Sequence, residues 1–149
     1  MTTINRLRDL TSYLDGLMAT VTVANGYLTN MGLAHYNGRR SLTTEDAPCV
    51  TLIVGPDEIQ EQSLTKARTK QRYGFSAFVP CDADSPNDAG QDAREDLLAV
   101  LFAGGDDLDG RVKRIEYVGH SMAPRADGDT VIQVVVEVDV TFSQSLTRN

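Results

Sequence analysis

The sequence predicts an α+β fold, in which two main α-helices pack on a mixed, mostly antiparallel β-sheet. Apolar residues recur every three or four positions in two segments, as they do along the buried face of a helix. Five other segments are apolar runs or alternate strictly, which is typical of strands. The expected order is α-β-β-β-α-β-β. A length of 149 residues fits one domain, so residues 1–149 are expected to form a single unit.

The first helix is expected over residues 3–23. The hydroxyl of Thr2 or Thr3 is placed to act as its N-cap, and Gly26 can take the left-handed conformation that ends a helix. The repeat covers too few turns for a coiled coil. Its apolar stripe consists of Ile4, Leu7, Leu10, Leu14, Leu17, Met18 and Val21.

Three strands are expected between the two helices. Residues 31–36 form a short one. Residues 49–54, introduced by Pro48, are a continuous apolar and β-branched run that suits a central strand, and Gly55-Pro56 is expected to break it. Residues 73–79 form the third strand, with alternate side chains on one side.

A basic segment precedes that third strand. It contains four bases that alternate with other residues, so an extended chain would place all of them on one side. They are Lys66, Arg68, Lys70 and Arg72. One interpretation is a solvated loop or an edge strand, where lysine blunts unwanted strand pairing. The other is a basic arm that contacts an acidic partner, and both stay open because the rest of the chain is acidic.

The stretch VPCDADSPNDAG, residues 79–90, holds one thiol and three aspartates. Asp82 and Asp84 have the spacing of the first and third ligands of an EF-hand loop, but three later positions of that motif do not match. As a helix start the fit is good, with Ser85 as N-cap and Pro86 in the first turn. The stretch is therefore interpreted as a strand-to-helix joint. The buried stripe of the second helix would consist of Ala89, Ala93, Leu97, Val100 and Leu101.

The C-terminal part is expected to form a long β-hairpin, with strands over residues 112–122 and 130–143 and a turn at residues 127–129. The second strand alternates, which predicts one buried and one solvated face. The buried face would carry Ile132, Val134, Val136, Val138, Val140 and Phe142, and the solvated face Gln133, Glu137, Asp139 and Thr141.

Composition excludes several classes of function. The net charge of −7, from 14 basic and 21 acidic residues, argues against a general binder of phosphate backbones. The apolar runs are too short to span a bilayer, and the N-terminal residues lack the apolar stretch of a signal peptide. The protein is expected to be made in a cytoplasm, with Cys49 and Cys81 as buried free thiols.

The sequence offers no recognisable catalytic chemistry. His35 has no carboxylate near it in the sequence, and His120-Ser121 lies outside any G-x-S-x-G motif. Cys81 has no second Cys or His at zinc-ligand spacing, and no nucleotide-binding loop or H-E-x-x-H motif occurs. The expectation is a protein that is not an enzyme and has no catalytic residue, metal site or cofactor.

The order of these local patterns is informative. An amphipathic helix leads to NMGLAHY, PCVTLIV and RYGFSAFVP, then to the helix DAGQDAREDLLAVL and a hairpin ending in DTVIQVVVEVDVTFS. In this layout the chain resembles the tail terminator (tail completion, or minor tail protein) family of long-tailed bacteriophages. The likeness lies in the layout and covers about residues 3–145.

The resemblance implies a structural protein of the virion. Such subunits form a six-membered ring on the head-proximal end of a finished tail tube, after assembly in the bacterial cytoplasm. The ring stops tube polymerisation and offers a docking surface to the head-closure or connector proteins. DNA passes through the ring without specific binding, and a negative lumen would keep DNA from sticking.

The resemblance also implies which residues make contacts. The excursion at residues 57–72 would project toward the tail tube protein or a neighbouring subunit, which makes its bases candidate contacts: Lys66, Arg68, Lys70 and Arg72. Arg39 and Arg40 are further candidates, and Glu137 and Asp139 are candidate acids of an interface or of the lumen.

Two alternatives remain. The first is another ring or adaptor of the same virion, such as a head-closure or connector protein, or the terminator of a contractile tail. The second is a small hydrolase that uses His120 with Ser121, or a metal ion held by Asp82 and Asp84. The hydrolase interpretation predicts inactivation by His120→Ala or stabilisation by metal, and the ring interpretation predicts neither.

Overall fold

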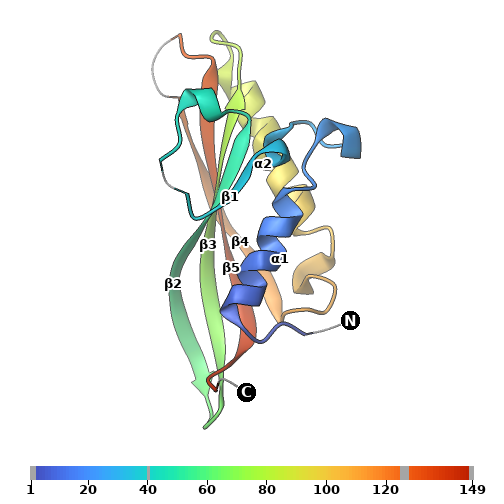
Figure 1. Ribbon diagram of the computed structural model, residues 1–149, viewed down its shortest axis with the longest axis vertical. Helices are drawn as coiled ribbons and strands as arrows, with labels where there is room; N and C mark the ends of the chain where they lie inside the picture. The colour runs from blue at the N-terminus through green and yellow to red at the C-terminus, as the bar shows by residue number, and fades with distance from the viewer. Residues whose placement is uncertain (1–2, 40, 125–127, 148–149) are drawn as a thin grey trace.

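The computed structural model describes residues 3–39, 41–124 and 128–147, and within them it confirms the predicted α+β class. A five-stranded sheet is covered by two α-helices on one face (Figure 1). The strand order is β1-β2-β3-β5-β4, with β1 parallel to β2 and the other pairs antiparallel. The helices are α1 (Leu7–Met18) and α2 (Pro86–Leu101), and the strands are β1 (His35–Asn37), β2 (Cys49–Gln62), β3 (Lys66–Pro80), β4 (Arg114–Pro124) and β5 (Val131–Ser145). Neither helix is long and apolar enough to cross a membrane.

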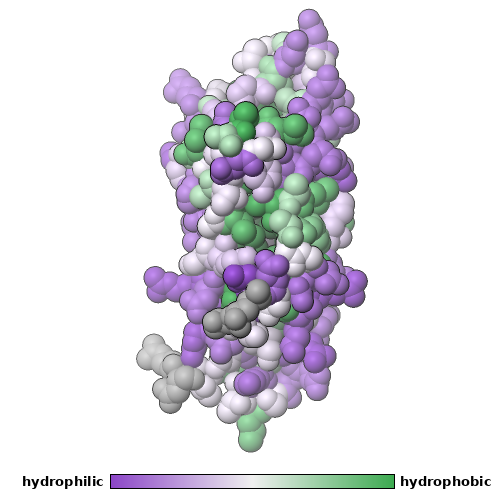
Figure 2. Space-filling view, turned by 90° about the vertical axis from the view of Figure 1, so that its right-hand side faces the viewer, coloured by the Kyte–Doolittle hydropathy of each residue, from purple (hydrophilic) through white to green (hydrophobic). Residues whose placement is uncertain are grey.

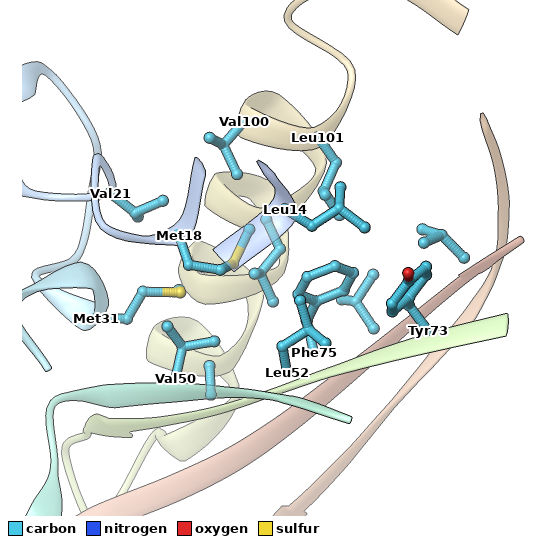
Figure 3. Packing of buried hydrophobic residues seen from close by; sticks show 14 of the residues in the cluster. Leu14, Met18, Val21, Met31, Val50, Leu52, Tyr73, Phe75, Val100 and Leu101 are labelled. Carbon is cyan, nitrogen blue, oxygen red and sulfur yellow. The ribbon is translucent and has the colours of Figure 1, made fainter. Parts of the chain in front are cut away.

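The hydrophobic core lies between the two helices and the sheet. Tyr73 and Phe75 of β3 meet Leu14 of α1 and Leu101 of α2 there, and all four are fully buried (Figure 3). The buried face predicted for β5 is confirmed, because its six core residues are completely buried. They are Ile132, Val134, Val136, Val138, Val140 and Phe142. Apolar alternation therefore fixes which face of β5 the helices cover. The predicted solvated face is only partly confirmed, since Asp139 and Thr141 are also buried.

Helix α1 is shorter than the sequence predicts. It begins after Arg6, which makes no side-chain cap, so the prediction of Thr3 as N-cap is wrong, and Thr2 lies outside the described residues. The N-terminal segment is instead tied to the sheet, since the Ser145 N–H at the end of β5 donates to the Asn5 carbonyl at 2.8 Å. Backbone bonding to another segment competes with helical turns.

The C-terminal end of α1 is set by a close crossing of the chain. A Cβ on Gly32 would lie 2.3 Å from the Met18 carbonyl oxygen, so residues 31–33 pass directly over the end of the helix. Residues 31–33 therefore form a short 3-10 turn, and β1 is only His35–Asn37 rather than the strand predicted over residues 31–36. Gly26 does take the left-handed conformation, with φ of 94°, but it ends a 3-10 turn at Val23–Asn25.

Strand β2 does not end at Gly55-Pro56, which contradicts the predicted break. Gly55 and Pro56 form a bulge opposite Arg72, and the strand pairs on to Gln62. Gln71 supports this bulge, because its side-chain amide donates to the Gly55 carbonyl at 2.7 Å. Beyond Leu52 no strand among the described residues pairs with the other side of β2, so a bulge there accommodates a proline that cannot donate.

Strand β3 is longer than predicted and takes in the whole basic segment. It starts at Lys66 and pairs with β2 on one side and β5 on the other. The interpretation of this segment as a loop or an edge strand is therefore wrong. Strands β2 and β3 form a hairpin that extends past the helices to one end of the molecule (Figure 1).

The second half of the chain follows the prediction closely. Ser85 occupies the N-cap position of α2, although its side chain makes no capping hydrogen bond, and Pro86 is the first residue of the helix. VPCDADSPNDAG therefore joins a strand to a helix, as predicted. Strands β4 and β5 form the predicted hairpin, and of the predicted turn at residues 127–129 only Asp127 lies outside the described residues. Both cysteines are free, as predicted, but only Cys49 is buried, and Cys81 is half-buried.

Candidate functional site

The helices leave the other side of the sheet uncovered. We call this side of β2, β3 and β5 the open face. In each strand every second side chain points to the open face, and the side chains between them point to the helices. The side chains on this face include Thr51, Ile53, Arg72, Ser76, Phe78, Gln133, Val135 and Glu137. Gly74 lies on the same face and contributes no side chain.

The basic row lies on the open face. Along β3 the four predicted contact residues alternate with Ala67, Thr69 and Gln71, which are buried. This alternation confirms that the bases share one side of an extended segment. The row consists of Lys66, Arg68, Lys70 and Arg72. The sequence alone correctly placed these side chains relative to one another, although not within the sheet.

Two of the bases are held by an acid of β5. Arg72 and Asp139 are paired across the strands, with Nε donating to Oδ1 at 2.8 Å and Nη2 donating to Oδ2 at 3.2 Å. This two-point hydrogen bond, followed by charge attraction, raises the pKa of the Arg72 guanidinium above its ordinary value. Lys70 Nζ lies 3.9 Å from Asp139 Oδ2. The Asp139 carboxylate, predicted as an interface acid, thus binds two cations of its own chain and is buried.

Glu137 is the more accessible of the two predicted acids. Its carboxylate lies 3.7 Å from Arg72 Nη1, and 48% of its side chain is exposed. Exposed ion pairs at such a separation contribute little stability. Glu137 is therefore available to a partner in a way that Asp139 is not.

The other two bases lie near the tip of the β2–β3 hairpin. Arg68 is 3.7 Å from Glu61, and both side chains are more than half exposed. Lys66 makes no ion pair with any other residue that the structure describes. Leu64, between the two strands, has 98% of its surface exposed. We call residues 61–68 the hairpin tip, and it presents one apolar side chain between charged ones.

A groove of about 400 Å³ is cut into the open face. Ile53, Gly74 and Val135 lie along its floor, and Gly74 leaves the floor open because the nearest atom to a Cβ there would be Val135 Cγ1, 4.0 Å away. Arg72 and Glu137 line one end. We call this feature the open-face groove.

The loop before β2 forms the opposite end of the groove. Thr51 Oγ1 donates to the Arg39 carbonyl at 2.9 Å and fixes the loop to the sheet. The Arg39 guanidinium stacks on the Tyr36 ring, 4.7 Å from its centroid, which holds it at the rim. Leu42 packs with Cys49 and Phe78 in a small second core beneath the loop. Arg40, the neighbouring predicted contact, lies outside the described residues.

The possible catalytic residues are not brought together. His35 bonds to Asp15 of α1, 3.0 Å between Nδ1 and Oδ1, so a carboxylate does approach it across the fold. His120 Nδ1 lies 2.9 Å from the Tyr117 hydroxyl and accepts a hydrogen bond from Arg94 Nε at 3.2 Å. His120 and Ser121 are neighbours on a strand, so their side chains point to opposite faces.

The acidic loop before α2 also has a structural role. Asp82 Oδ1 accepts the Asp84 N–H at 2.9 Å and closes the turn that leads into the helix. Across the residues that the structure describes, no group of three or more His, Cys, Asp or Glu side chains is arranged to hold a metal ion.

Sequence reasoning missed two features of this surface, the open-face groove and Leu64. A glycine inside a strand leaves one face without a side chain at that position, so Gly74 was the residue from which the groove could have been predicted. Leu64 is an isolated apolar residue in a polar segment, and isolated exposed leucines are common. Only the hairpin geometry shows that Leu64 lies at a projecting tip. Surface leucines and valines also occur at Val23, Leu28 and Leu33 on the segment after α1.

Comparisons with known proteins found similarity among solved structures alone. No family model matches the chain, and no curated protein matches it. A search of solved structures aligns it with a chain of the virion of a native gene transfer agent particle, at 13% identity and a TM-score of 0.47 over 90% of each chain. Values at this level establish neither a shared family nor a shared function.

Proposed function

We propose that this chain is a structural protein of a phage-like virion, and that it acts as a tail terminator. In this proposal its subunits form a ring, most simply of six, on the head-proximal end of the tail tube. The ring contacts the tail tube protein on one side and a head-closure or connector protein on the other. It ends tube polymerisation, and DNA passes through it without being bound specifically.

The observation that carries the proposal is the projecting β2–β3 hairpin. It extends beyond the part of the sheet that the helices cover (Figure 1) and ends in Leu64, which its own chain leaves exposed. Figure 2, which views the helix-covered side, shows hydrophobic surface again at the lower end, where this hairpin ends. A projecting hairpin with an apolar side chain at its tip and charged residues beside it is suited to binding another subunit.

The order of elements supports the same assignment. The chain runs α1, β1, β2, β3, α2, β4, β5, which is the layout on which the resemblance to tail terminators rests. The projecting arm coincides with the excursion at residues 57–72 that this resemblance assigns to contacts with the tube or a neighbour. Lys66 and Arg68 are the proposed contacts, because the other two bases of the row are engaged with Asp139.

The chemistry of the surface fits an assembly role better than a catalytic one. His120 and Ser121 point apart, and Asp82 is engaged in a turn. The net charge of −7 would disfavour adhesion to DNA that passes through a ring. We therefore propose a function without a reaction, a cofactor or a membrane.

The native mass of the purified protein over a wide concentration range tests the proposal. Six 16.2 kDa subunits would give a ring of about 97 kDa. The assembled protein is then added to growing tail tubes, and we expect capped ends and shorter tubes under the electron microscope. A protein that neither assembles nor caps tubes at any concentration would contradict the proposal, as would a dimer that tightens with added metal.

A further inference from the structure

This inference rests on the proposed function and names the contact that joins neighbouring subunits. We propose that the hairpin tip of one copy, centred on Leu64, docks into the open-face groove of a second copy. The two surfaces are different patches of the same chain, so the contact is head-to-tail. Head-to-tail contacts whose rotation closes generate rings.

The groove has room for an apolar side chain. Its floor carries Ile53 and Val135, and Gly74 contributes no side chain between them. A Cβ built on Gly74 meets no atom of its own chain closer than 4.0 Å. The missing side chain is therefore not required for packing within the subunit, and the space above it is available to another molecule.

The hairpin tip supplies the matching apolar group. Leu64 is 98% exposed, the largest exposure among the large hydrophobic residues that the structure describes. Full burial of a leucine side chain strengthens association roughly tenfold to hundredfold. The chain cannot place Leu64 in its own groove, because β3 pairs continuously with β5 from Lys66 to Pro80 and holds the tip away from it.

The charges beside the two surfaces are complementary. Lys66 at the hairpin tip makes no ion pair with another described residue, while Glu137 lies exposed at one end of the groove. Glu61, on the other arm of the tip, is exposed, and Arg39 lines the opposite end of the groove. A tip inserted with Leu64 over Gly74 can bring each acid toward a base, which favours the pairing of these two patches.

Two variants remove one side of the contact each. Leu64→Asp places a charge on the tip, and Gly74→Val fills the groove. Both positions face solvent in the subunit, so both variants should fold. We expect the concentration at which half of the protein is assembled to rise about thirtyfold or more in each.

Matched variants control for general effects of these changes. Leu33→Asp introduces the same charge at another exposed leucine, and Gly119→Val introduces the same side chain at a β4 glycine whose Cβ would meet nothing within 4 Å. Gly119 lies opposite Glu137 on the far side of β5, two strands from Gly74 and outside the groove. We expect both controls to assemble like the unchanged protein.

Mixing the two defective variants tests the head-to-tail geometry directly. Leu64→Asp keeps an intact groove and Gly74→Val keeps an intact tip, so one contact can form between them and none can follow. We expect a one-to-one dimer of about 32 kDa, two 16.2 kDa subunits, in sedimentation experiments. Each variant alone should remain monomeric at the same concentration.

Disulfide capture extends the test to an association that is too weak for the dimer to be detected by sedimentation. Leu64→Cys and Gly74→Cys are prepared separately with Cys81→Ser, because Cys81 is the more accessible native thiol. We expect a mixed disulfide on oxidation, and far less when Gly119→Cys replaces Gly74→Cys. Equal capture at both positions, or capture at neither, would overturn the docking contact.

The outcomes separate this contact from the proposed function. If both defective variants still form a ring that caps tubes, the docking contact is wrong and the tail terminator proposal stands. If the mixed dimer or the specific disulfide forms but the unchanged protein never caps tubes, the contact is right and the proposed function fails.

Discussion

Tyr73 illustrates how one buried side chain links helix and sheet. Its ring lies in the core, and its hydroxyl bonds to Thr11 Oγ1 of α1 at 2.9 Å. Thr11 Oγ1 also donates to the Leu7 carbonyl, so the tyrosine hydroxyl is the donor to Thr11. Burial raises the pKa of Tyr73 from its ordinary value of 10.0 to about 12, because the charged form would lose its hydration.

This pKa predicts an alkaline loss of stability. A group whose folded pKa is raised contributes its full stability below the unfolded pKa near 10 and loses it as the pH rises through 12. The shift corresponds to about 2–3 kcal/mol of unfolding free energy. We expect Tyr73→Phe to cost about 1 kcal/mol at pH 7 and to lose less stability above pH 10, measured by urea unfolding. Tyr27→Phe, at a half-buried tyrosine, is the control, and an equal alkaline response of the two variants would contradict the assignment.

Asp96 is a buried carboxylate that holds a loop. It accepts hydrogen bonds from the Leu28 N–H at 2.9 Å and from the N–H and hydroxyl of Thr29, both at 2.7 Å. These bonds fix the segment after α1 to the side of α2. Nothing in the sequence indicated this role for Asp96, because its partners lie more than sixty residues away.

We therefore expect Asp96→Asn to destabilise the protein by about 2–3 kcal/mol, since an amide turns donors toward groups that must donate. Asp92→Asn, at an exposed position one turn earlier, should change the free energy of unfolding by less than about 0.5 kcal/mol. Chemical denaturation of both variants at pH 7 measures the difference. Equal effects at the two positions would show that Asp96 has no anchoring role.

At the scale of elements, the sequence predicted the type and order of the helices and strands but not all of their bounds. Periodicity identifies which segments bury a face, and it succeeded for β5, where every second residue is apolar. It failed at Gly55-Pro56, which normally ends a strand. The amide of Gln71 and the long pairing with β3 keep β2 extended there, and neither is visible in a local pattern.

The two arms of the hairpin should differ in hydrogen exchange. Strand β3 is paired on both sides, whereas β1 covers β2 only at Val50 to Leu52 and leaves the rest of β2 as an edge. We expect strong protection along β3 and fast exchange of every second amide of β2 between Asp57 and Gln62 in the monomer. Amide exchange followed by NMR distinguishes the arms. Uniform protection would show that another chain or segment covers this edge.

At the scale of the whole molecule, the open face could not be predicted from the sequence. Glu137 and Asp139 have the same alternation along β5, and both were expected to be solvated. Arg72 and Lys70 pack against Asp139 and bury its carboxylate, whereas the Glu137 side chain stays exposed. Likewise, Gly74 forms part of a groove only because Ile53 and Val135 lie beside it on the neighbouring strands.

The distribution of charge is also a property of the whole molecule. Residues 82–96 hold six acids and one base, a net charge of −5, whereas residues 57–72 hold four bases and three acids, a net charge of +1. Most of the total of −7 therefore lies away from the hairpin tip. Neighbouring copies should repel each other at long range while the proposed contact is close to neutral locally.

This separation predicts how salt changes assembly. The Debye length, beyond which exposed charges are largely screened, is about 30 Å at 0.01 M salt and about 10 Å at 0.1 M. Modest salt therefore removes the repulsion between whole subunits before it weakens the attraction between charged groups in contact. Exposed ion pairs such as the one proposed between Lys66 and Glu137 contribute about 1 kcal/mol at most. We expect the half-assembly concentration to fall as sodium chloride rises from 0.01 to 0.15 M, measured by sedimentation at pH 7. Lys66→Glu should shift the whole curve to higher concentration and make it fall more steeply with salt, because the net charge of each subunit changes from −7 to −9. A steady weakening with salt in the unchanged protein would mean that contact charges, rather than Leu64, dominate the interface.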